Sequence, residues 1–489
     1  MTADRLDQKL AALAAFPQAD EAVVARMGEL LPGLDDRSVR RVNPLRFASE
    51  HGLPEDKVVD FFLCATRAGL FDLSWNLTCP ACGGILNRNG SLDELSGPEM
   101  EHCVLCDIDV QKSLDDHVET SFTLSQAVRE LDIQAHTDLQ SYLAAHFSGN
   151  VTLDPELWAY VSSVLRGYLG LGPGEEREVL FADWSEPRFR VVSIAVHEAV
   201  SVPMGAGRAE AEQTLRLSLS RRGFEASVSP GPELLPGPVR VIARNLLDDP
   251  VGLSFFAVDY TRLHEIIARA RNTVRPFLTG KSLLTNQTFR ELFRVQTLAP
   301  NLNLNMRSLT VLFTDLKDST ALYEKIGDVA AYSLIQKHFD ALARVVRQHR
   351  GSVVKTMGDA VMAAFSDPTE ALRAAIGMLD AAACLGQQVG LKIGLHEGPA
   401  LVINNVGSLD YFGQTVNVAA RVQGLAGSGE VWASGGLMSW PGAAQALSAL
   451  GWTSQEHQAT LKGVGGTTTV FQLLPQAART QEPLCPEYS

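Results

Sequence analysis

Two aspartates that border short apolar stretches are the residues best suited to chemistry. Asp315 follows an apolar run in SLTVLFTDLKDST, and Asp359 precedes another in KTMGDAVMAAF. Carboxylates are hard oxygen ligands that suit Mg²⁺ or Mn²⁺, and two such ions about 3.5–4 Å apart can clamp the attacking and leaving oxygens of a phosphoryl transfer. The pair therefore predicts a nucleotide-using enzyme. Taken alone, each aspartate could instead cap a helix or begin a turn.

Four cysteines form a second candidate site. They occur as CPAC and CVLC, and the two pairs are separated by 20 residues. Paired cysteines at this spacing can place four thiolates around one tetrahedral zinc ion. We therefore predict one structural Zn²⁺, with redox-active or unligated thiols as the alternative. The predicted ligands are Cys79, Cys82, Cys103 and Cys106.

Composition limits the classes of partner. The chain has 489 residues, 46% of them hydrophobic, so about three domains of roughly 150 residues are expected. Its net charge of −14 opposes nonspecific binding to nucleic acid or to an anionic membrane. No stretch approaches the roughly 20 apolar residues that span a bilayer, and the first residues, MTADRLDQKL, are charged. A soluble, cytoplasmic protein without a membrane partner is expected.

The region before residue 307 divides into four expected parts. The pattern of residues 1–75 predicts a helical module that is helix-turn-helix-like or winged-helix-like. Residues 76–120 are expected to form a zinc ribbon. Acidic residues outnumber basic ones in both, which argues against a DNA contact. Residues 121–257 predict a mixed α/β regulatory or docking domain, whose ligand the sequence does not identify. Residues 258–306 predict a helical connector.

The elements that must position the aspartates lie in residues 307–475. Their apolar patterns predict a βαββαβ order, which makes an α/β (more strictly α+β) fold with helices covering a sheet that contains antiparallel strands. Asp315 would then end the first strand, and Asp359 would occupy the hairpin between the next two. The two carboxylates are expected at neighbouring strand ends. Residues 476–489 predict a flexible tail.

Four motifs in this region, taken in order, resemble the class III nucleotidyl cyclases. They are FTDLKDST, KTMGDAVMAAF, LKIGLHEGP and DYFGQTVNVAARVQ. The resemblance implies a ferredoxin-like catalytic domain over residues 307–475 and two Mg²⁺ or Mn²⁺ ions on Asp315, Asp359 and the backbone carbonyl of Leu316. It also implies a homodimer, in which each active site takes its metal aspartates from one subunit and its remaining residues from the other.

The same resemblance places a base-recognition pair at Lys355 and Asp410. Adenine offers an acceptor at N1 and a donor at its amino group, whereas guanine reverses this pattern. A lysine donor and an aspartate acceptor therefore suit adenine. In guanylate cyclases the resemblance implies a Glu and a Cys at the two matching positions. ATP is the expected substrate. Without the surrounding motifs, a surface lysine and a turn aspartate would be an adequate explanation.

Two further residues, Asn417 and Arg421, lie four apart on a predicted helix and so share one face. The resemblance implies that Asn417 orients the ribose and that Arg421 stabilises charge on the attacked phosphate. Lys392 and Lys462 are implied phosphate contacts. Asp318 departs from the family pattern, in which many members have glycine. It is expected to cap the following helix, and as an added carboxylate beside the phosphates it could instead weaken ATP binding or alter the metal preference.

The sequence thus predicts an adenylate cyclase regulated by its amino-terminal region. Attack of the ribose 3′ oxygen on the α-phosphate would give cyclic AMP and pyrophosphate, with no dedicated general base. One alternative is a zinc-ribbon DNA-binding or nucleotide-sensing regulator with a weakly active cyclase domain. Another is a guanylate cyclase, which Lys355 and Asp410 disfavour.

Overall fold

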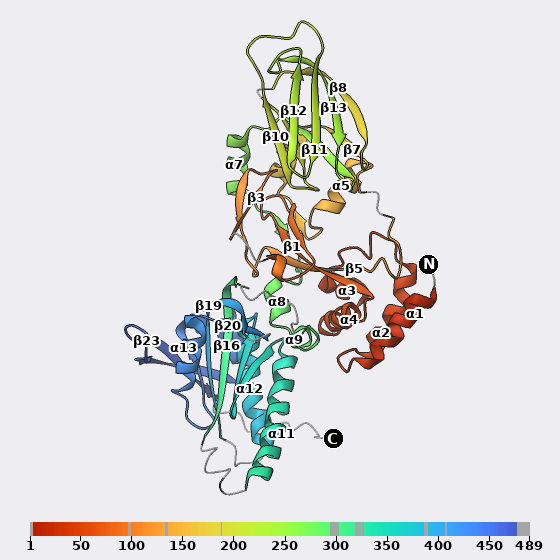
Figure 1. Ribbon diagram of the computed structural model, residues 1–489. Helices are drawn as coiled ribbons and strands as arrows, with labels where there is room; N and C mark the ends of the chain where they lie inside the picture. Colours follow the sequence, from red (N-terminus) through yellow and green to blue (C-terminus); the bar gives the residue numbers. More distant parts are fainter. Residues whose placement is uncertain are drawn as a thin grey trace.

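The computed structural model describes residues 3–476 except 96–98, 133–134, 187, 294–302, 318–323, 325–326, 386–389 and 406–407. Figure 1 shows a β-rich region at one end of the molecule, a helix-covered sheet at the other, and the amino-terminal helices between them. Asp318 and most of the expected tail lie outside the described residues. Among the helices that are described, none is long and apolar enough to cross a membrane.

The amino-terminal helices pack on a three-stranded sheet of order β2-β1-β5. Their ends are set by capping: the side chains of Asp20 and Asn43 accept backbone N–H groups at the starts of α2 and α3. The boundaries expected near residues 75 and 120 fall inside β1 and β5, so helices and sheet share one core. The elements are α1 (Ala3–Ala11), α2 (Glu21–Leu30), α3 (Pro44–His51), α4 (Glu55–Arg67), β1 (Phe71–Thr78), β2 (Ile85–Asn89) and β5 (Val118–Leu124).

A short hairpin, β3 (Met100–Cys103) and β4 (Ile108–Gln111), lies between β2 and β5 and carries the second cysteine pair. After β5 come two helices, α5 (Leu139–His146) and α6 (Pro155–Val164), with the short strand β6 (Val151–Thr152) between them. These helices pack against one end of the β-rich region.

The β-rich region consists of two four-stranded sheets, of order β10-β9-β14-β7 and β12-β11-β13-β8. Alternating side chains point inward, as in β11, where Leu215, Leu217 and Leu219 are buried. Residues 121–257, expected as mixed α/β, are therefore mainly a two-sheet sandwich with α5 and α6 at its end. The strands are β7 (Leu165–Leu171), β8 (Glu176–Trp184), β9 (Arg188–Ser193), β10 (Glu198–Pro203), β11 (Gln213–Ser220), β12 (Gly223–Ser229), β13 (Gly237–Asn245) and β14 (Val251–Phe256).

A connector then returns the chain to the amino-terminal core and on to the last domain. Its residues Leu283, Leu284 and Phe289 are buried in the same core as α4 and β1. It is therefore part of the packed interior of the molecule. Its elements are α7 (Tyr260–Arg269), β15 (Thr273–Val274), α8 (Gly280–Leu284) and α9 (Gln287–Leu292).

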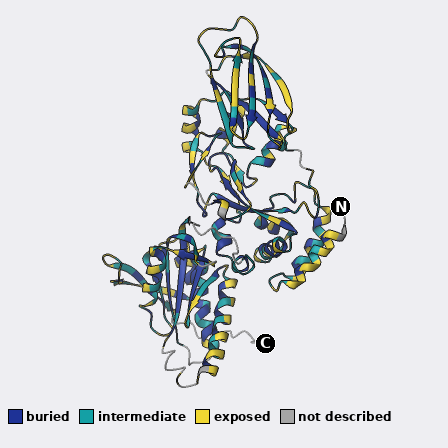
Figure 2. Cartoon of the chain, viewed as in Figure 1, coloured by how far each residue is buried: buried dark blue, intermediate teal, exposed yellow. Residues whose placement is uncertain are grey.

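The carboxy-terminal domain has one sheet of order β17-β18-β16-β19-β21-β23-β22, with β20 paired to β19. Leu312 of β16 faces α11 and α12, whereas Val311 and Phe313 face the opposite side, on which α13 lies. In Figure 2 the central strands of this sheet are largely buried. The elements are β16 (Asn303–Lys317), α11 (Asp328–Gln348), β17 (Ser352–Met357), β18 (Ala360–Phe365), α12 (Pro368–Cys384), β19 (Gly390–Asn405), β20 (Ser408–Phe412), α13 (Gln414–Gln423), β21 (Val431–Ser434), α14 (Gly435–Met438), α15 (Ala443–Ala449), β22 (Trp452–Ala459) and β23 (Thr468–Pro475).

Candidate functional site

Asp315 and Asp359 lie at the same edge of the sheet. β16 and β18 are antiparallel with Phe313 opposite Met362, so continuing the register by two residues brings Asp315 beside the residue that follows Asp359. The Val361 N–H also donates to the Thr314 hydroxyl at 3.0 Å, which fixes the two strand ends together. The structure thus places Asp315 and Asp359 at neighbouring strand ends.

The donors at this edge fit a divalent cation. Asp359 Oδ2 is buried and has no hydrogen-bond partner, a state that is costly unless a cation or donor satisfies the oxygen. Gly358, with φ of 64°, supplies the left-handed turn that presents Asp359 between β17 and β18. Leu316, the predicted carbonyl ligand, is 4% exposed directly after Asp315.

Lys392, predicted to contact phosphate, lies directly opposite Asp315 in the β16–β19 pairing. Its Nζ is 2.6 Å from Asp315 Oδ2, and the two side chains are 23% and 35% exposed. The ammonium group therefore stands next to the predicted metal site in this structure. Lys462, the other predicted phosphate contact, is exposed in the turn between β22 and β23.

The predicted base-recognition residues contact one another. Lys355 Nζ on β17 lies 2.6 Å from Asp410 Oδ2 on β20, and Asp410 is 6% exposed. Asn405 donates to the same oxygen at 3.0 Å, and the Tyr411 N–H donates to Oδ1 at 2.8 Å. Burial opposes the charged carboxylate, but the hydrogen bonds from Lys355 and Asn405 outweigh it and lower the pKa of Asp410.

Asn405 is a site residue that the sequence did not reveal. It lies at the end of β19 and enters the site because the β19–β20 hairpin places it opposite Ser408, close to Asp410. In the sequence, only a correct prediction of the β19–β20 pairing could have identified Asn405. Its hydrogen bond helps to position Asp410, the predicted base acceptor.

Asn417 and Arg421 are exposed on α13, which lies close against the sheet. The approach is tight, because a Cβ on Gly394 of β19 would lie 2.1 Å from the backbone nitrogen of Gln423. Neither Asn417 nor Arg421 forms a hydrogen bond or ion pair with another described residue. Both side chains are therefore available to a ligand or to a second subunit.

The connector helix α9 contacts β17 and β20, the two strands that carry the predicted base-recognition residues. The Gln287 side chain accepts the Val353 N–H of β17 at 2.8 Å, and Arg290 donates to the Leu409 carbonyl of β20 at 2.5 Å. The Arg290 guanidinium also lies 5.6 Å from the centre of the Tyr411 ring. These contacts join segments that are more than 60 residues apart in the sequence, so no local sequence pattern predicts them.

The four predicted zinc ligands converge. The sulfur atoms of Cys79, Cys82, Cys103 and Cys106 all lie within 4.8 Å of one another, and the four residues are buried. Hydrogen bonds from Cys106, Cys79 and Cys82 lower the pKa of Cys103, whereas hydrogen bonding to Cys103 raises the pKa of Cys82 and of Cys106. Four crowded sulfurs with one favoured as thiolate fit a tetrahedral Zn²⁺.

Two family models match the chain. Residues 5–291 match a family of unknown function, DUF5939, and residues 304–471 match the adenylate and guanylate cyclase catalytic domain. An uncharacterized protein of Mycobacterium tuberculosis is 31% identical over 165 residues, which are 33% of this chain and 40% of that protein. A protein of the same species named pH-sensitive adenylate cyclase is 30% identical over 174 residues, which are 36% of this chain and 42% of that protein.

The adenylate cyclase of Lachancea kluyveri is 33% identical over 187 residues, covering 33% of this chain and 10% of that protein. The chain thus spans less than half the length of these relatives. Among solved structures, the adenylyl cyclase CyaB from P. aeruginosa covers 36% of this chain and 97% of its own, with 20% identity and a TM-score of 0.33. The guanylate cyclase domain of RhGC from Catenaria anguillulae covers 35% and 98%, with 19% identity and a TM-score of 0.31.

Proposed function

We propose that this chain, which belongs to the DUF5939 family and carries a class III nucleotide cyclase domain at residues 304–471, is an adenylate cyclase. The proposed reaction converts ATP into 3′,5′-cyclic AMP and pyrophosphate. The observation that supports ATP as the substrate is the ion pair between the partly exposed Lys355 and the buried Asp410. Its lysine can donate to adenine N1 and its aspartate can accept from the adenine amino group, whereas guanine would meet a donor with a donor.

The chemistry rests on positioned charge. Two Mg²⁺ or Mn²⁺ ions held by Asp315, Asp359 and the Leu316 carbonyl would acidify the ribose 3′-hydroxyl and neutralise the phosphates. Arg421 would stabilise the charge that develops on the α-phosphate, and Asn417 would orient the ribose. Binding of the base by Lys355 and Asp410 then fixes the nucleoside, so that orientation supplies much of the acceleration.

The active site is proposed to be shared between two copies of the chain. Asn417 and Arg421 are exposed in the single chain, and so are the apolar side chains of Met357 and Phe412, at 43% and 62%. Met357 lies two residues from Asp359, and Phe412 lies two residues from Asp410. Exposed apolar side chains beside both halves of the site support an interface there.

Complementation tests the shared site. An Asp315→Ala chain and an Arg421→Ala chain, each inactive alone, should regain activity when mixed, because one of the two sites in the mixed dimer is then intact. The mixed dimers are isolated through two different affinity tags, and cyclic AMP is measured. Inactive mixed dimers of proven composition would contradict the shared site but leave the substrate proposal standing.

Product identification tests the activity itself. The full chain is incubated with ATP or GTP and Mn²⁺, and the products are separated by chromatography. Cyclic AMP from ATP is expected, with the Asp359→Asn variant as the matched negative control because it keeps the side-chain shape and loses the charge. Cyclic GTP as the main product would overturn the substrate assignment.

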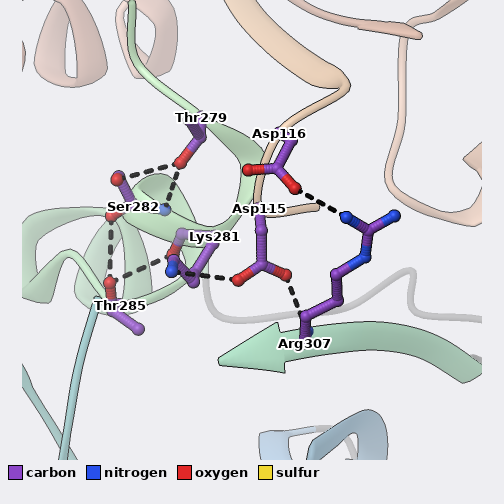
Figure 3. A network of polar contacts seen from close by, with 7 residues as sticks. All are labelled: Asp115, Asp116, Thr279, Lys281, Ser282, Thr285 and Arg307. Carbon is purple, nitrogen blue, oxygen red and sulfur yellow. Dashed lines mark hydrogen bonds and ion pairs between the residues drawn. The ribbon is translucent and has the colours of Figure 1, made fainter. Parts of the chain in front are cut away.

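Regulation by the amino-terminal region is proposed to act through two contacts. The first is α9, which holds β17 and β20 through Gln287 and Arg290. The second is the junction in Figure 3, where Asp115 pairs with Lys281 of α8 at 2.9 Å and accepts the Arg307 N–H of β16 at 2.7 Å. A shift of the amino-terminal core would therefore move strands that carry base-recognition and metal residues.

The zinc is proposed to be structural, since its four predicted ligands are buried and join the turn after β1 to the β3–β4 hairpin. Purified protein should contain about one zinc per chain by atomic spectroscopy. Cys103→Ser should lose the metal and lower the melting temperature, whereas Cys64→Ala, a buried cysteine on α4, should keep the metal. A metal-free wild-type protein with an unchanged melting temperature would contradict this role.

A further inference from the structure

A large apolar cavity lies outside the cyclase domain, where α5, α6 and α7 meet the β9–β14 sheet and the second cysteine pair. Its volume is about 820 Å³. Leu143, Leu157, Val161, Ile194, Phe256 and Leu263 form much of its wall. Protein interiors normally pack with few voids larger than a water molecule, whereas small-molecule sites measure roughly 300–1,000 Å³. The size is that of a ligand site.

The wall specifies the body of the ligand. No Asp, Glu, Lys, Arg or His lines the cavity. The Tyr160 hydroxyl already donates to the Asp259 carbonyl at 2.8 Å, and the Ser148 hydroxyl donates to Glu119 at 2.6 Å. These two hydroxyls are therefore engaged within the protein, and most of the other side chains on the wall are apolar. A body made of CH₂ groups gains free energy there simply by leaving water.

Charge near the cavity specifies the head group. The Arg262 guanidinium lies 5.3 Å from the centre of the Tyr160 ring, and Tyr160 is part of the wall. Within the described residues Arg262 has no ion-pair partner and is exposed. A second cation, Arg190, lies 5.0 Å from the ring of Tyr260, another wall residue. Carboxylates also lie near these rings, but Glu186 pairs with Arg166 and Asp259 caps α7, whereas Arg262 has no ion-pair partner among the described residues. Arg262 is therefore the cation that can pair with an anionic head group.

We propose that this cavity binds a long-chain carboxylic acid, with its aliphatic chain among the apolar side chains and its carboxylate near Arg262. The proposal concerns binding alone and does not depend on cyclase activity. Trp158, which is 54% exposed, lies in the wall and provides a built-in reporter.

The test measures quenching of tryptophan fluorescence in the full chain by 9,10-dibromostearic acid. Saturable quenching is expected in the wild type and should largely disappear in Trp158→Phe, because the bromines would lie beside that ring. Val161→Phe, which fills the cavity, should weaken binding at least tenfold. Equal quenching in wild type and Trp158→Phe, or no quenching in either, would overturn the proposal.

The head group is tested separately on an exposed residue whose replacement leaves the core intact. Binding of unbrominated stearic acid and of stearyl alcohol is measured by their displacement of the brominated acid, with its affinity for each variant taken into account. Arg262→Gln should raise the dissociation constant of stearic acid about fivefold, while that of stearyl alcohol stays the same. Arg216→Gln, an exposed arginine on β11, is the matched control and should change neither. If Arg262→Gln leaves displacement by the acid unchanged, the carboxylate assignment is wrong.

Discussion

Lys355 and Asp410, which are 55 residues apart in the sequence, form an ion pair of 2.6 Å between two different strands of one subunit. Asp410 is nearly buried, whereas the Lys355 side chain is 38% exposed. The pair is held at its buried end by Asn405 and at its strands by α9. Asp410 is therefore held in place, and the more exposed Lys355 is the partner that can turn toward the base that we propose this pair binds.

Reversing the donor and acceptor at this pair should reverse the substrate preference. In the double variant Lys355→Glu, Asp410→Cys, the ratio of kcat/KM for ATP to that for GTP should fall about 100-fold or more, since each mispaired buried polar group costs about 1–3 kcal/mol. Lys337→Glu, an exposed lysine on α11, controls for charge. An unchanged ratio would show that other residues read the base.

Lys392 should compete with metal for Asp315. Replacing it by methionine removes the 2.6 Å ion pair, so the Mn²⁺ concentration giving half-maximal activity should fall about two- to fivefold, as expected for a partly exposed pair. If the freed ammonium normally moves to phosphate, KM for ATP should rise at the same time. Metal and ATP titrations measure both, with Lys337→Met as the control. If neither changes, Lys392 has no part in the site.

The sequence motifs were sufficient to predict a cyclase domain in the carboxy-terminal region. The family model that matches residues 304–471 confirms this prediction. Apolar strand patterns and the glycine turn before Asp359 also predicted that Asp315 and Asp359, the proposed metal ligands, lie at neighbouring strand ends. The contacts of Lys392 and Asn405 needed the register of β16, β19 and β20, which local patterns do not encode. In residues 121–257 the alternation predicted strands but not how two sheets would pair.

The two neighbouring aspartates at the domain junction should differ in their effect on stability. Asp115 has a side chain 6% exposed and pairs with Lys281, which is 13% exposed; Asp116 and Arg307 are both about half exposed. Asp115→Ala would leave Lys281 buried without its partner and should lower the free energy of unfolding by about 3 kcal/mol. Asp116→Ala should cost about 0.5 kcal/mol.

Calorimetry and urea unfolding of the full chain compare these two variants. The junction joins the amino-terminal core to β16, so we expect the Asp115→Ala transition to broaden or divide as the two parts lose their coupling. Equal stability of the two variants would mean that the Asp115 contacts in Figure 3 contribute little to holding the parts together.

Asp60 should make stability depend on pH. It lies on α4 in a cleft shared with α9 and α11, and burial raises its pKa to about 6, against the opposing effects of Thr288, Lys57 and Arg347. Between about pH 4 and pH 6 the folded chain keeps this proton and the unfolded chain has lost it. The folded state therefore binds more protons, and its stability falls as pH rises through this window.

The Asp60→Asn variant, which cannot ionise, isolates this contribution. Its stability relative to wild type should increase between pH 4 and pH 6 and then stay constant, by of order 1–2 kcal/mol after allowance for partial exposure. Melting temperatures measured across this range give the difference curve. A flat curve for Asp60→Asn would show that the cleft leaves this carboxyl hydrated.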